Sequence, residues 1–165
     1  MSLWILALSY WIHLLSTVVW FGGLAVMGLA ALPAFRQGVL EANQWLALQK
    51  RFVLWVNGSL VLLLITGFVQ MTNDANYNGF LAIDSIWAWA MLLKHVAYGL
   101  LVLITAYLQF GLYPAMARTA VLAQKRPRLA AAEQDKLSST EARLLKINLV
   151  CAAFILMCTA VATAV

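Results

Sequence analysis

The two histidines of this sequence, His13 and His95, each lie inside a long run of apolar residues. A titratable side chain within such a run is costly in lipid and marks a functional site with a partner. Imidazole nitrogens ligate haem iron, copper and other transition metals. A haem or metal centre built on this pair is therefore the first chemistry that the sequence suggests. Structural or proton-carrying roles of the two histidines are the alternatives.

The elements that must position these histidines are membrane-spanning helices. The chain has 165 residues, of which 64% are hydrophobic and 10% charged, and its mean hydropathy is +0.87. A spanning helix needs roughly 20 predominantly apolar residues, and the runs 4–32, 52–71, 86–113 and 145–165 meet this requirement. No alternation typical of a β-barrel occurs. The sequence predicts an all-α integral membrane protein, a single four-helix up-down bundle over residues 1–165.

The basic residues predict the topology of this bundle. Of the eleven Lys and Arg residues, three lie between the first and second helices and seven lie at or between the third and fourth. The connection between the second and third helices has none, only Asp74 and Asp84. This asymmetry places both basic connections in the cytoplasm and both termini in the periplasm, in a bacterial inner membrane. The net charge of +5 thus indicates contact with lipid headgroups and not a nucleic-acid partner.

The two halves of the chain share a weak internal repeat. The span from His13 to Pro33 matches the span from His95 to Pro114, and a basic stretch and a return helix follow each proline. We therefore expect two pseudo-repeated helical hairpins, in which each proline ends its helix. Trp45 is expected to anchor the connection between the first and second helices at the membrane surface. Residues 138–141, with Ser138 and Glu141, have the form of a capping box before the fourth helix.

The repeat places the two histidines at one depth. Each lies about nine residues into its helix, which at about 1.5 Å per residue is roughly 14 Å below the end. The first and third helices are diagonal in an up-down bundle, so two inward imidazoles can clamp one haem b iron. Thr17 and Gly99, one turn from the histidines, leave room for the ring. A six-coordinate haem favours electron transfer, as a subunit of a membrane redox complex.

Lys94 is the basic residue inside the third apolar run. A haem propionate or a substrate carboxylate is a partner that explains its cost, and a side chain reaching the interface alone is the alternative. On the second predicted helix, the polar residues Asn57, Ser59 and Thr66 are expected to bond neighbouring helices rather than a substrate.

Copper is the main alternative to haem. Cu(I) prefers thioether and thiolate ligands, and Met91 lies four residues before His95 on the same helix face. The other methionines are scattered through depth, and no two of the six stand at a spacing of three or four. Cys151 and Cys158 lie on one helix face, seven residues apart, and cannot pair with each other. They are expected to be small buried hydrophobic residues.

Several short motifs resemble those of the copper resistance D family. They are the run from His13 to Leu24, Arg51-Phe52, the run from Leu64 to Phe68, Leu93-Lys94, and Tyr113-Pro114-Ala115. The resemblance implies a four-helix membrane protein that takes up or exports copper. The same positions look more distantly like the HemJ-type protoporphyrinogen oxidases. That likeness implies a bound haem b and functional roles for His13 and Lys94.

Overall fold

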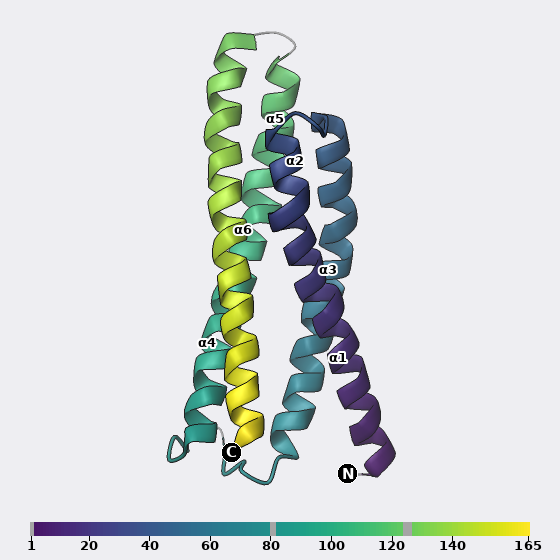
Figure 1. Cartoon of the computed structure of the whole chain (residues 1–165), viewed down its shortest axis with the longest axis vertical. Coiled ribbons are helices and arrows are strands. Elements are labelled where there is room, and N and C mark those ends of the chain that lie inside the picture. Colours follow the sequence, from purple (N-terminus) through teal and green to yellow (C-terminus); the bar gives the residue numbers. More distant parts are fainter. Residues whose placement is uncertain (1, 80–81, 124–126) are drawn as a thin grey trace.

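The computed structural model describes residues 2–79, 82–123 and 127–165, and all its regular structure is helical (Figure 1). Four helical rods are long and apolar enough to cross a membrane. They are Leu3–Arg36, Asn43–Thr72, Ile86–Ala123 and Ala130–Ala164. The predicted all-α four-helix membrane bundle is confirmed, and the chain is a multi-pass membrane protein.

The rods are built from six α-helices and two π-helical segments. The first rod joins α1 (Leu3–Ala25), the π-helical segment η1 (Val26–Ala31) and α2 (Leu32–Arg36). The second rod is α3 (Ala42–Thr72). The third joins α4 (Ile86–Tyr107), the π-helical segment η2 (Leu108–Leu112) and α5 (Tyr113–Ala123), and the fourth is α6 (Pro127–Ala164).

The prediction that each proline ends its helix was wrong. Pro33 is the second residue of α2 and Pro114 is the second residue of α5, and each follows a π-helical segment. A proline has no N–H and its ring crowds the carbonyl four residues back. A π-turn just before it widens the backbone, which lets the rod continue past the proline. The same device in both halves agrees with the repeat of two hairpins.

The second and fourth helices begin earlier than predicted, at Ala42 instead of 52 and at Pro127 instead of 145. Glu41, whose side chain and that of Gln44 form a capping box, starts α3. The predicted capping box was wrong, because Ser138 and Glu141 lie inside α6. Trp45 is no surface anchor, since it is 1% exposed and stacks on Phe35 with ring centroids 5.3 Å apart. Of the connection between the third and fourth rods, residues 124–126 lie outside the described residues.

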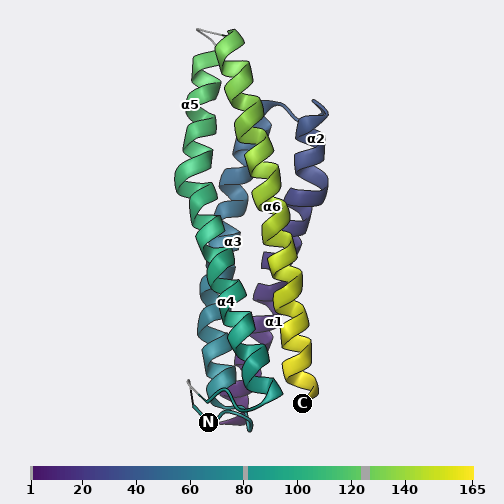
Figure 2. The ribbon, with the colours of Figure 1, turned by 90° about the vertical axis from the view of Figure 1, so that its left-hand side faces the viewer.

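The rods form two antiparallel hairpins with both termini at one end (Figure 1). We call this the terminal end, and the other the opposite end. Within each hairpin α1 packs against α3 and α4 against α6, and α6 also contacts α1. Tyr98 of α4 donates a hydrogen bond to the Leu60 carbonyl of α3 at 2.7 Å. The rods that carry α1 and α4 therefore occupy opposite corners of the bundle, as the turned view in Figure 2 shows.

Buried apolar side chains form three layers along the bundle. The middle layer contains Trp20, Leu60, Leu101 and Ile155, together with the small residues Ala97 and Ala152. A second layer around Met27 and Trp45 lies toward the opposite end, and a third around Met71 and Trp87 lies toward the terminal end. The middle layer lies between the cluster around Met27 and Trp45 and the cluster around Met71 and Trp87.

Candidate functional site

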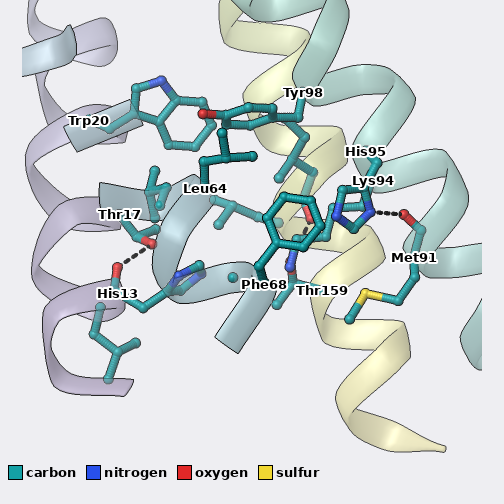
Figure 3. Close-up of a pocket in the computed structure, with 15 residues that line it drawn as sticks. His13, Thr17, Trp20, Leu64, Phe68, Met91, Lys94, His95, Tyr98 and Thr159 are labelled. Atoms are coloured by element: carbon teal, nitrogen blue, oxygen red, sulfur yellow. Dashed lines mark hydrogen bonds between the residues drawn. The ribbon is translucent and has the colours of Figure 1, made fainter. Parts of the chain in front are cut away.

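A cavity of about 170 Å³ lies between the rods on the terminal side of the middle layer. Both histidines line it, His13 from α1 and His95 from α4 (Figure 3). The other polar or chemically distinctive residues of the wall are Thr17, Gly67, Phe68, Met91, Lys94, Tyr98 and Thr159. The structure thus brings together the two histidines that the sequence separates by 82 positions. Their role as ligands stays a prediction.

The hydrogen bonds of His13 define its tautomer. Its Nδ1 lies 2.8 Å from the Thr66 hydroxyl of α3, and that hydroxyl donates its one proton to the Leu62 carbonyl at 2.6 Å. The Thr66 oxygen therefore accepts from His13, whose proton sits on Nδ1. The Nε2 atom of His13 is left with a free lone pair.

His95 has the same arrangement with a different acceptor. Its Nδ1 lies 2.6 Å from the backbone carbonyl of Met91, one turn earlier in α4. A carbonyl can only accept, so Nδ1 of His95 is also the protonated nitrogen. The ring of Phe68 lies against the imidazole, with centroids 5.9 Å apart. An oxygen acceptor that holds Nδ1–H and presents Nε2 is how proteins orient histidines that ligate metals.

Of the two residues expected to leave room for a ring, one lines the cavity. The Thr17 hydroxyl donates to the His13 carbonyl at 2.8 Å, which steadies the α1 turn that carries His13. Gly99 is exposed and lies outside the described cavity. Gly67 stands closer to the site, because a Cβ there would meet Cε1 of His13 at 3.6 Å.

Lys94 lines the same cavity as the histidines. Its side chain is half-buried and comes from the turn of α4 that also carries His95 (Figure 3). A cation in a largely apolar wall is costly unless a ligand or a proton transfer compensates it. A role of Lys94 toward a ligand therefore stays a prediction.

A second cavity, of about 230 Å³, adjoins the first at the terminal end. Met71 of α3 and Met91 of α4 both line it and share one buried cluster, although 20 positions separate them. The expectation that the methionines are scattered was therefore wrong for this pair, which spacing within one helix could not reveal. Met91 and His95 line both cavities and so form the wall between them.

The donor set of the first cavity is small and soft. Among the residues that the structure describes, no three His, Cys, Asp or Glu side chains gather closely enough to hold a metal ion. Cys151 and Cys158 are free thiols, and neither lines the described cavities. The soft or borderline donors among the lining residues are the imidazole nitrogens of the two histidines and the Met91 thioether.

The residues present do not fit a haem between His13 and His95. An apolar cavity of about 150 Å³ holds one benzene molecule, and a porphyrin carries four pyrrole rings around its iron. The cavity of about 170 Å³ therefore has room for an ion with a few waters but not for a macrocycle. Haem b binding finds no support in this geometry.

The polar contacts predicted for α3 are observed for Asn57 and Thr66, whereas no bond of Ser59 to a neighbouring helix is seen among the described residues. Asn57 and Gln109 exchange two hydrogen bonds, of 2.9 and 2.8 Å, between α3 and η2. Thr66 bonds His13 as described above. Sequence reasoning placed Thr66 among residues that join helices, but nothing in the spacing identified it as the partner of His13.

Four apolar rods around a cavity lined by two histidines define a small multi-pass membrane protein. The family model for copper resistance protein D matches residues 46–162, which is most of the chain. The chain belongs to this family. Met91, Lys94 and His95 lie inside the matched region, whereas His13 lies before it. No curated protein and no solved structure matches the chain significantly.

Proposed function

We propose that this chain carries copper, as Cu(I), through the two adjoining cavities of its terminal half. The observation that carries the proposal is the shared arrangement of the two histidines: each places Nδ1 against an oxygen acceptor, which leaves Nε2 free, and both line one cavity. Membership of the copper resistance protein D family supports copper over other metals.

The donor chemistry favours Cu(I). Imidazole nitrogen and thioether sulfur are soft or borderline ligands, and Cu(I) accepts two or three of them. The described wall of the cavity carries no carboxylate, the ligand that Mg²⁺ and Ca²⁺ require. A site of few neutral ligands binds reversibly, which suits an ion that must leave again.

The wall shared by the two cavities suggests a sequence of ligands for the ion. Met71 and Met91 meet it in the cavity at the terminal end. Met91 and His95, which line both cavities, pass it inward, and His13 completes the inner site. With both termini in the periplasm of an inner-membrane protein, as the charge asymmetry predicts, this route begins on the periplasmic side.

The middle layer closes the route toward the opposite end. Trp20 and Ile155 line the inner cavity, and both belong to the buried layer that also holds Leu60 and Leu101. A copper ion does not cross such a dry layer without new ligands. Transport therefore requires a second conformation in which the rods separate at this level.

Copper binding by the purified protein tests the proposal. Protein in lipid nanodiscs is titrated anaerobically with Cu(I) against a chromogenic chelator. We expect one ion per chain, and loss of at least tenfold in affinity for His13→Ala and for His95→Ala. Gly99→Ala is the matched control, because nothing lies within 4 Å of the added Cβ, and it should bind as the wild type does.

The same preparations test the haem alternative. An absorption spectrum with a sharp low-spin α band after reduction, abolished in either histidine variant, would overturn the copper proposal in favour of electron transfer. Wild-type affinity for Cu(I) in both histidine variants would overturn it as well.

A further inference from the structure

The opposite half of the bundle contains a buried carboxyl group that the copper route does not use. Glu141 of α6 is fully buried. One of its oxygens accepts from Trp45 Nε1 at 3.3 Å, and the other accepts from Gln49 Nε2. Among the described residues no Lys, Arg or His forms an ion pair with it. A buried carboxylate without a countercharge is strongly destabilising.

Two amide oxygens near this carboxyl also have no partner. They are Oε1 of Gln49 and Oδ1 of Asn148, in residues that are 2% and 1% exposed. An ionised Glu141 sets the orientation of Gln49, because a carboxylate only accepts and so faces the NH₂ group. Asn148 donates its own NH₂ to Thr105 Oγ1 at 3.2 Å. Each side chain thus uses its donor elsewhere and leaves an acceptor unsatisfied.

Both amides line one small cavity, of about 40 Å³, on the far side of the middle layer. A single water needs roughly 10–15 Å³ measured this way, so the space admits an ion or a few waters and no organic ligand. Thr105, Gln109 and Tyr113 add further oxygen atoms to its wall. With water alone in the cavity, Glu141 has to stay protonated to avoid a buried charge, whereas a cation satisfies the amide oxygens and also compensates an ionised Glu141.

We propose that this cavity binds one small alkali-metal cation, of the size of Na⁺. Oε1 of Gln49 and Oδ1 of Asn148 are its protein ligands, and Glu141 balances its charge through Gln49. Neutral amide oxygens are hard donors that suit an alkali cation and not Cu(I). The site is therefore chemically distinct from the histidine cavity.

An opening toward the opposite end supports the assignment. A cavity of about 360 Å³ shares Gln49, Val53, Gln109 and Tyr113 with the small one and extends to Lys50, which is exposed. The two cavities therefore adjoin at Gln49, on the side of the middle layer that faces the opposite end. The reciprocal bonds between Asn57 and Gln109 brace α3 against η2 on the route.

Binding of radioactive ²²Na⁺ to the full chain in nanodiscs, without copper, tests the proposal. Choline replaces sodium at constant ionic strength in the background measurement. We expect saturable binding of one ion per chain. Glu141→Gln, which removes the charge, and Asn148→Leu, which removes the oxygen at similar volume, should each weaken it at least tenfold. Asp135→Asn makes the same charge change at an exposed position of α6 and should leave binding unchanged.

Three outcomes would overturn the assignment. They are the absence of saturable sodium binding by folded wild-type protein, equal weakening by Asp135→Asn, and binding that Asn148→Leu leaves intact. A further outcome also overturns the assignment: the wild type takes up a proton and no ²²Na⁺, and Glu141→Gln loses this proton uptake. That result would identify Glu141 as a proton site. If Glu141→Gln does not fold, Asn148→Leu decides, since it changes no charge. Copper is absent throughout, so failure here leaves the copper proposal untouched.

Discussion

Replacing Thr66 by valine removes the hydroxyl that accepts the Nδ1–H of His13, with almost no change of side-chain volume. In the wild type the Thr66 proton is directed to the Leu62 carbonyl, which is why the hydroxyl acts as an acceptor toward His13. In Thr66→Val the imidazole has no acceptor at Nδ1. It can then rotate or place its proton on Nε2, which removes the lone pair from the cavity.

The size of the effect follows from the type of contact. Loss of an acceptor that orients a metal-ligating histidine typically weakens the metal site by about 10–100-fold, or about 1.4–2.7 kcal/mol. The unpaired N–H, half-buried against α3, also costs about 1–3 kcal/mol of folding stability. Thr66→Ser keeps the hydroxyl and should retain Cu(I) affinity within about threefold of the wild type.

Two measurements check this prediction. A Cu(I) titration against a chelator gives the affinity of each variant. Nitrogen NMR of protein labelled at histidine gives the tautomers, and the chain contains two histidines, so the signals are readily assigned. In the wild type both residues should show protonated Nδ1 and bare Nε2. Thr66→Val should change the His13 signals and leave those of His95, whose acceptor is the Met91 carbonyl. Wild-type tautomers with wild-type affinity in Thr66→Val would refute the orientation argument.

Three further predictions concern charge, route and topology. Lys94→Gln should raise Cu(I) affinity, because it removes a positive charge from the wall of the cavity that holds the cation; Lys94→Arg, which keeps the charge, should give no gain. Met71→Leu should slow copper uptake into vesicles without changing equilibrium affinity, whereas Met91→Leu should reduce both, and identical behaviour of the two variants would contradict the proposed order. Alkaline phosphatase fused after Val165 should be active in cells, since a periplasmic C-terminus is predicted; an inactive fusion that is well expressed would reverse the proposed direction of the route.

Features of the fold that depend on hydropathy and on the internal repeat could be predicted from the sequence. Apolar runs predicted the rods, and the repeat predicted that His13 and His95 share a level. Both arguments use properties of single segments, which the bilayer enforces through length and backbone hydrogen bonding. They do not depend on knowing which side chains meet.

Features that depend on contacts between distant segments escaped sequence reasoning. The stretch 127–144 has enough charge to resemble a connection, yet packing of α6 against α5 keeps it helical. Glu141 matched a local capping pattern, but its partners, Trp45 and Gln49, lie more than 90 residues away. Met71 and Met91 form a pair across two helices, which no count of spacings along one helix detects.

The two halves of the bundle differ in what they can hold and also in which rods hold it. His13, Lys94 and His95 belong to the two rods that contain a π-helical segment and a proline. Gln49, Glu141 and Asn148 belong to α3 and α6, which are uninterrupted α-helices. Each π-turn is a weak point at which a rod bends at low cost. We therefore expect any bending of the bundle to occur in the two histidine rods and not in α3 or α6.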